Sequence, residues 1–385
     1  MNANNWPQFR LVNCFGHWPS GGATGQAQRA FSYTLVVLTA GLLAAEAVST
    51  SWYFASGELQ GALINLNELV SGLQCFNFVF TFLLYKAEIS NVVLLIEDLT
   101  IRALEEARHL DVEEIVRRRR KRCLWAYRFF FWMFVVICHW ALPPLLHFFV
   151  YGEPAVIVHS WLPFDNTKAA GFLANYFLQL LPCISFCACN VMFGSVFISI
   201  SELTLGHMEI LGRRLANVRY GRRDTHRELN RCIRHHEEIL RIIQIFQDFC
   251  SSPLVILCLL TIVTLCVILF EITCIETTSN ERMINILAEG QMIFLTTATC
   301  CWYANEVTFQ SRELIRPGYM SNWYEGVEKD KKSLLNLMTR TTVQGYFGRF
   351  MKMDLLTFIN ILKAAFSFYN FLAAVNSNQR NIDKK

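Results

Sequence analysis

The chain has 385 residues, of which 53% are hydrophobic and only 17% are charged, and its formal net charge is +4. This balance, together with 31 Phe, is typical of a helical membrane protein and argues against a soluble two-domain enzyme. The apolar runs are continuous rather than alternating, which argues against a transmembrane β-barrel. The first 29 residues are polar and contain no apolar core, so we expect no cleavable signal peptide.

Seven apolar segments follow one another along the chain, and each approaches or exceeds the roughly 20 residues that cross a bilayer as a helix. They are 30–52, 60–85, 125–150, 169–200, 251–273, 284–303 and 355–375. The sequence therefore predicts an all-α polytopic membrane protein with seven transmembrane helices. Of the Lys and Arg residues, 27 lie before the first segment or in alternate connections from there, 5 lie on the other side, and 3 lie in or beside the spans. The positive-inside rule then predicts a cytoplasmic N-terminus and an extracellular C-terminus.

The connections predicted to be cytoplasmic are long, namely 86–124, 201–250 and 304–354, whereas the opposite ones are short. Glu97–Arg122, Glu228–Gln247 and Gly326–Arg340 each carry charge or apolar spacing that is typical of helices. We therefore expect helix extensions that form an anchor bundle beneath the membrane. The basic run Arg117–Arg122 is expected to act as a topology anchor at anionic lipid.

Prolines interrupt two spans in the half of the membrane predicted to be the outer one. Pro143 and Pro144 lie in the third span and Pro182 lies in the fourth, and such breaks are tolerated where a cavity or neighbouring helices satisfy the backbone. The pair His235-His236 resembles a metal site, but adjacent helical side chains point in different directions. We predict no metal and no cofactor.

Several functional classes lack their sequence signals. The chain has no Gly-rich phosphate loop, no Walker lysine motif and no Gly-x-Ser-x-Gly elbow, so an enzyme is not expected. It also lacks the Asp/Glu-Arg-Tyr and Asn-Pro-x-x-Tyr motifs of G-protein-coupled receptors, and the span lengths show no transporter-like repeat. A ligand receptor or a channel remains.

Motifs in the second half of the chain resemble those of a known family. Residues 319–324, 331–335, Arg340 and 354–367 resemble the C-terminal signature of insect odorant receptors, and residues 228–240 resemble that family's helix before the fifth span. Phe366 departs from the pattern, because the family usually has Tyr there.

The resemblance implies a heteromeric, ligand-gated, non-selective cation channel in the plasma membrane of olfactory sensory neurons. This chain resembles the variable, odorant-binding subunit, whose partner is an odorant receptor co-receptor subunit in a heterotetramer. Its ligand would be a small volatile odorant. A gustatory receptor-type channel that works without the co-receptor is the alternative.

The expected organisation has five parts. Residues 1–29 form a cytoplasmic segment, 30–303 contain helices one to six with the odorant pocket in their outer half, and 304–354 form the cytoplasmic anchor region. Residues 355–376 form the pore-lining helix, and 377–385 form an extracellular tail.

The pocket is predicted on spans two, three, four and six, where apolar and aromatic residues share helix faces. Ordinary helix packing is the alternative reading for each residue. The candidates are Leu69, Val70, Leu73, Met133, Val136, Ile137, Trp140, Tyr176, Gln179, Leu180, Cys183, Gln291, Met292 and Leu295. On the last span one face, which could alternatively pack on a neighbouring helix, is predicted to line the pore: Tyr369, Leu372, Ala373 and Asn376.

Overall fold

The computed structural model describes residues 6–18, 23–106, 111–138, 141–152, 168–274, 280–340 and 351–383. Every regular element among these residues is a helix, which confirms the predicted all-α class. In chain order the helices are α1 (Pro7–Cys14), α2 (Ala23–Ser56), α3 (Leu59–Leu84), α4 (Lys86–Glu106), α5 (Val112–Cys138), α6 (Leu142–Tyr151), α7 (Ala169–Ala216), α8 (Thr225–Cys274), α9 (Asn280–Glu313), α10 (Ile315–Tyr319), the 3₁₀ turn η4 (Trp323–Glu325), α11 (Glu328–Thr339) and α12 (Leu355–Asp383).

Four of these helices, α2, α7, α8 and α12, are by themselves long and apolar enough to cross a membrane. A fifth candidate is α3, which passes the same test jointly with α4, although the two are bent by 67° where they meet. The predicted span 284–303 lies within α9, where the polar Asn285, Glu289 and Gln291 dilute the apolar run. Span 125–150 is divided between α5 and α6.

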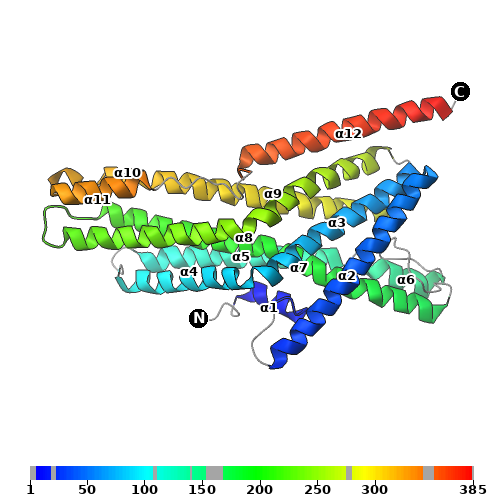
Figure 1. The fold of residues 1–385 in the computed structure, drawn as a ribbon, viewed down its shortest axis with the longest axis horizontal. Helices are drawn as coiled ribbons and strands as arrows, with labels where there is room; N and C mark the ends of the chain where they lie inside the picture. Colours follow the sequence, from blue (N-terminus) through cyan, green and yellow to red (C-terminus); the bar gives the residue numbers. More distant parts are fainter. Residues whose placement is uncertain are drawn as a thin grey trace.

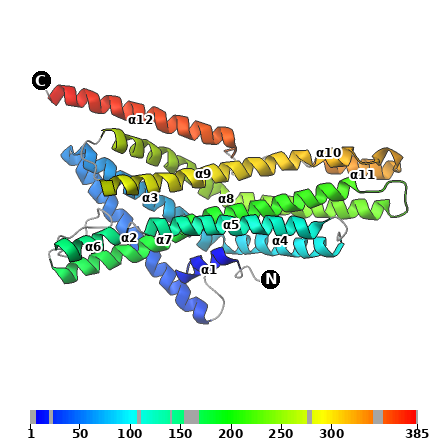
Figure 2. The same ribbon diagram turned by 180° about the vertical axis from the view of Figure 1, so that it is seen from behind.

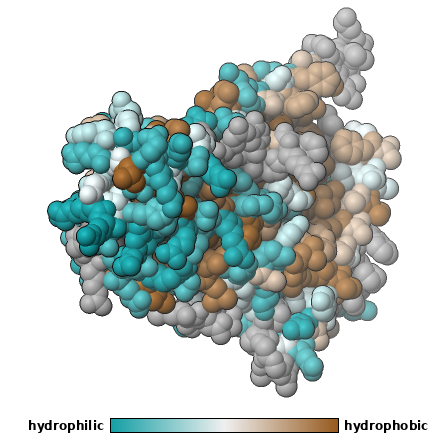
Figure 3. Space-filling model, turned by 60° about the vertical axis from the view of Figure 1, so that its left-hand side comes forward, coloured by the Kyte–Doolittle hydropathy of each residue, from teal (hydrophilic) through white to brown (hydrophobic). Residues whose placement is uncertain are grey.

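Several helices extend far beyond any membrane. At a rise of 1.5 Å per residue, the 48 residues of α7 and the 50 residues of α8 span roughly 72 and 75 Å, more than twice a hydrocarbon core of about 30 Å. Their polar halves run together with α4, the start of α5, the end of α9, α10 and α11 into one end of the molecule (Figures 1 and 2). We call this the polar end. Figure 3 shows hydrophilic side chains gathered there and hydrophobic ones over the rest of that face.

The helical stretch expected over Glu97–Arg122 is two helices rather than one. Helix α4 ends at Glu106 and α5 begins at Val112, and Asp111 just before it has a left-handed backbone with φ of 53°. Residues 107–110 lie outside the described part. The two helices lie side by side at the polar end (Figure 1). By contrast, Glu228–Gln247 lies within the single helix α8.

The predicted proline breaks have different outcomes. Helix α5 ends at Cys138, and Pro143 and Pro144 occupy the first turn of α6, where a missing N–H costs no helical hydrogen bond. Pro182, however, lies inside the continuous helix α7, and Pro253 lies inside α8. The prolines of the third predicted span thus stand at the start of a separate helix, whereas Pro182 does not end α7.

Helix α7 lies at the centre of the core and packs against α5, α3, α9 and α8. The approach to α5 is close at Gly194, because a Cβ atom there would come within 2.7 Å of ring carbons of Phe130. The N-terminal segment also joins the core. Phe9 and Trp18 stack with ring centroids 4.2 Å apart and are buried, and the Gln8 amide donates to Ser199 Oγ of α7 at 3.0 Å.

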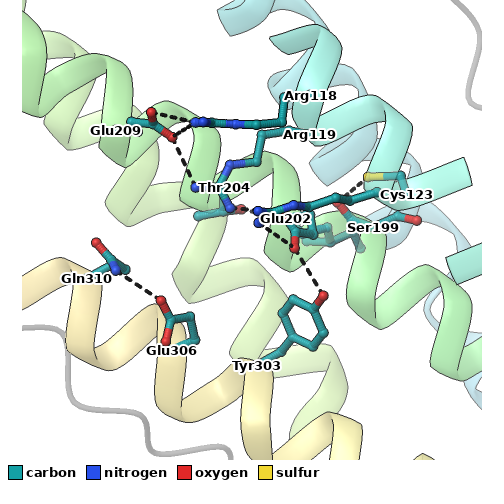
Figure 4. A network of polar contacts seen from close by, with 12 residues as sticks. Arg118, Arg119, Cys123, Ser199, Glu202, Thr204, Glu209, Tyr303, Glu306 and Gln310 are labelled. Carbon is teal, nitrogen blue, oxygen red and sulfur yellow. Dashed lines mark hydrogen bonds and ion pairs between the residues drawn. The ribbon is translucent and has the colours of Figure 1, made fainter. Parts of the chain in front are cut away.

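A charged network fastens α5 to α7 and α9 at the polar end (Figure 4). The Arg119 guanidinium donates to Glu202 at 2.8 Å and to Glu209 at 3.1 Å, while Arg118 donates to both carboxylate oxygens of Glu209. Tyr303 of α9 donates its hydroxyl to Glu202 at 3.0 Å. Arg120 pairs with Glu97 of α4. The basic run predicted to meet lipid is thus largely engaged within the protein.

Candidate ligand site and conduction helix

The predicted residues of α7 lie in an aromatic cluster at the end of the molecule away from the polar end. Phe172 and Tyr176 are buried, and Leu180 and Cys183 pack against them together with Leu145 and Phe148 of α6. The rings of Phe148 and Phe172 stack at 4.0 Å, and Tyr176 donates its hydroxyl to the Ala141 carbonyl at 2.9 Å, where α6 begins. Gln179 is also buried. The predicted list did not include Phe172 or the α6 residues, although the aromatic residues of the α6 region were a sign in the sequence of an aromatic cluster there.

The candidates on the other three helices divide by exposure. Val70, Met133 and Met292 are buried, whereas Leu69 and Leu295 are half-buried. Leu73, Val136 and Gln291 are exposed in the single chain. Trp140 and the side chain of Ile137 lie outside the described residues. The structure therefore gathers part of the predicted set inside the bundle and leaves three members on its surface.

A partly buried polar layer, which the predicted list did not include, joins α3 to α9. The Asn67 amide donates to Glu289 Oε2 at 2.9 Å, and the Ser71 hydroxyl donates to Glu289 Oε1. Glu46 of α2 and Gln74 of α3 are buried nearby in the spans, and each has side-chain polar atoms without a hydrogen-bond partner. Ionisable residues within a predicted span are a recognisable functional signal, and Glu46 and Glu289 carried it in the sequence.

On α12 the four predicted pore residues are half-buried rather than open. Tyr369 and Leu372 pack against Leu63, Val267 and Phe270 of α3 and α8, and Ala373 and Asn376 share that helix face. The opposite face carries exposed polar residues at helical spacing. This polar stripe consists of Asn360, Lys363, Ser367, Asn370 and Ser377. Figures 1 and 2 show α12 lying along the outside of α8 and α9.

The histidines at the polar end lie in a buried hydrogen-bonded chain. Thr100 donates to the Ile96 carbonyl and therefore accepts from His207 Nε2 at 3.0 Å, and His207 Nδ1 lies 3.4 Å from His235 Nε2. Burial lowers the pKa of His207 to about 4 and the pKa of His235 well below 6.5. His236 is buried as well. Within the described ranges no group of three or more His, Cys, Asp or Glu side chains could hold a metal ion.

Comparison with known proteins gives consistent matches. The family model described as 7tm Odorant receptor matches residues 65–366. Odorant receptor 10 of Aedes albopictus is 23% identical over 55% of this chain and 58% of its own length, and Odorant receptor 46a, isoform A, of Drosophila melanogaster is 22% identical over the same shares. The matched part thus spans less than two thirds of these relatives.

Solved structures agree on the fold. The insect olfactory receptor OR5 from Machilis hrabei in complex with eugenol superimposes with a TM-score of 0.81 at 17% identity, over 96% of this chain and 97% of that one. A second structure of the same receptor superimposes with a TM-score of 0.80. At this identity the match shows the seven-span fold alone. Because the family model covers well over half of the sequence and the fold agrees throughout, the chain belongs to the 7tm odorant receptor family.

Proposed function

We propose that this chain is the odorant-binding subunit of a heteromeric, ligand-gated, non-selective cation channel. The observation that carries the proposal is the division of the molecule into two ends. The polar end holds charged helix extensions suited to contacts in water, and the other end holds an aromatic cluster around Phe172 and Tyr176. Membership of a multi-pass receptor family supports it, and the related OR5 has been solved with the small aromatic molecule eugenol.

In this proposal the ligand binds among α3, α5, α6, α7 and α9, in the region of the fourteen predicted residues and the Phe148–Phe172 stack. Small volatile molecules offer few polar groups, so dispersion and shape supply most of the binding energy. The Tyr176 hydroxyl is already used by Ala141, which leaves its ring face for contact. A ligand opens the channel only by binding the open state more tightly than the closed one.

The proposal also assigns roles to the parts of the chain. Residues 30–303 sense the ligand, 304–354 anchor the subunit in the cytoplasm, 355–376 line the pore, and 1–29 and 377–385 lie on opposite sides of the plasma membrane. On α12 we favour the polar stripe as the pore surface, because Tyr369 and Leu372 pack on α3 and α8. Lys363 lies on this stripe, where its flexible side chain can extend its ammonium toward water.

Co-expression with the odorant co-receptor tests the proposal. Odorant-evoked cation current should be recorded from cells that carry both subunits and from none that carry this chain alone. Phe172→Ala should raise the half-maximal odorant concentration at least 10-fold, whereas Phe149→Ala, at a side chain 69% exposed, should change it less than 2-fold. Current from this chain alone would instead support the gustatory-type alternative. Silence with a broad odorant panel, despite delivery to the cell surface, would contradict both.

A further inference from the structure

A small cavity at the polar end is lined mainly by basic side chains. It has a volume of about 160 Å³ and lies between α4, α7 and α8. Four arginines line it, Arg102, Arg214, Arg231 and Arg234, together with His235. Only two carboxylates, Glu106 and Glu238, share the lining. The walls therefore carry an excess of positive charge.

The deepest of these arginines is incompletely hydrogen-bonded. The Arg214 side chain is 10% exposed, and its Nη1 donates to Glu106 Oε2 at 3.1 Å. Its Nε and Nη2 have no partner, and neither does Arg102 Nε, although both Arg102 Nη atoms donate to Glu238. Buried guanidinium donors without acceptors are costly, so the cavity is short of acceptor atoms.

The positive charge at the mouth of the cavity is not neutralised by ion pairs either. Arg231 and Arg234 lie one turn apart on the exposed side of α8, and neither forms an ion pair within the described residues. The positive charge reaches the histidines beside the cavity: after burial itself, Arg214 and Arg102 contribute to lowering the pKa of both His207 and His235. His235 Nδ1 has no partner either.

We propose that this cavity binds a phosphate group, either as inorganic phosphate or as the end of a phosphate monoester. A phosphate offers several strong acceptor oxygens, which match guanidinium forks in pairs. The volume accommodates one such group and no large apolar molecule. His235 is neutral and its Nε2–H donates a hydrogen bond to His207 Nδ1. Its unprotonated Nδ1 can therefore accept a hydrogen bond from the hydroxyl of a hydrogen phosphate.

The position of the cavity favours a water-soluble source over a lipid headgroup. Arg214 lies 14 residues beyond the apolar span 169–200, and His235 lies 16 residues before the span 251–273. Along continuous helices these separations correspond to roughly 21 and 24 Å. A headgroup held in a bilayer does not reach that far. The ligand is therefore a dissolved phosphate species on the aqueous side of the protein.

Thermal unfolding of the purified full-length chain in detergent tests this without any odorant. Inorganic phosphate at 10 mM should raise the melting temperature relative to chloride at equal ionic strength, because it binds only the folded state. Arg214→Gln and, separately, Arg234→Gln should weaken the phosphate dependence about 10-fold in Kd, as expected for the loss of one charged hydrogen bond. Arg241→Gln, on an exposed turn of the same helix outside the cavity, should leave it unchanged.

Each other outcome is decisive. If phosphate and chloride give the same melting temperature, the cavity holds only water and the inference is wrong. It is also wrong if Arg241→Gln weakens the response as much as Arg234→Gln, since the effect is then one of general charge. In a parallel arm, vesicles containing a phosphoinositide should not bind more tightly to the wild type than to Arg234→Gln. Binding confined to such vesicles would contradict the proposal of a soluble ligand.

Discussion

Arg118 and Arg119 are adjacent in the sequence and both form ion pairs with acids of α7, but their burial differs. The Arg119 side chain is 14% exposed and pairs with Glu202, which is 4% exposed, whereas Arg118 is 48% exposed. Removing one partner of a buried pair leaves an uncompensated charge, so Arg119→Gln should cost about 3–5 kcal/mol of stability. Arg118→Gln should cost about 1 kcal/mol or less. Thermal unfolding in detergent measures the difference, and equal losses would contradict this account.

The buried histidine chain predicts a loss of stability in acid. The pKa of His207 is about 4 in the folded protein, below its unfolded value of about 6.5. The unfolded chain therefore binds more protons between these values, and the stability present above pH 6.5 is lost as the pH falls toward 4. His207→Gln keeps a donor for Thr100 and should reduce the drop in melting temperature between pH 7 and 5. A drop in His207→Gln as large as that of the wild type would exclude His207 as its source.

The same histidines show what sequence can and cannot supply at the scale of single residues. Adjacency singled out His235 and His236, and helical geometry argued against a metal shared by the two. The actual neighbour of His235 is His207, 28 residues away on another helix. That contact depends on how α7 and α8 pack, which no local pattern encodes. Likewise, Glu289 is an ionisable residue in a predicted span, but its donors Asn67 and Ser71 are 222 and 218 residues away in the sequence.

Among the helices, α12 gives the sharpest test, because its two faces have different surroundings. Cysteines placed in turn at Ser367 and Asn370, on the polar stripe, should react with a membrane-impermeant cationic thiol reagent and lose current in the open channel. Cysteines at Tyr369 and Leu372, packed against α3 and α8, should be protected. Current recording during reagent application measures both. Block at Tyr369 and Leu372 with none at Ser367 would restore the face predicted from sequence.

Hydrophobic runs located the spans well, but their interruptions less well. The runs 30–52, 169–200, 251–273 and 355–375 lie within single helices, because continuous apolar sequence of that length leaves the backbone no better partner than itself. The third run is divided between α5 and α6, and the charge pattern across 97–122 is divided between α4 and α5. Periodicity persists across such breaks, so it does not reveal them. Pro143 correctly indicated the start of a separate helix, α6. Pro182 also suggested a helix break, but it lies inside the continuous helix α7.

At the scale of the whole molecule, the sequence contained the organisation but not the partners of its charges. The count of basic residues separated one set of connections from the other, and the described helices of the basic set lie together at the polar end (Figure 1). It did not show that most of the run Arg117–Arg122 pairs with acids of α4 and α7. The ion pairs between α5 and α7 join residues that are about 80 or more positions apart in the sequence. They therefore depend on how the two helices pack against each other. Residues 65–366 carry the family signal, so the overall fold was the most predictable level.

The orientation in the membrane is the remaining prediction at this scale. Of the basic residues, 27 lie in the N-terminal segment and in the connections that form the polar end, against 5 on the other side. Anionic lipid on the cytoplasmic leaflet and the insertion machinery both favour retaining such charge in the cytoplasm. An N-terminal epitope tag should therefore be stained only after permeabilisation, and a C-terminal tag should be stained on intact cells. The opposite pattern would place the polar end outside and return the chain to a G-protein-coupled arrangement. Ion pairing of Arg118, Arg119, Arg120 and Arg122 does not weaken the expectation, because orientation follows the number of Lys and Arg residues in the connections rather than their partners in the folded protein.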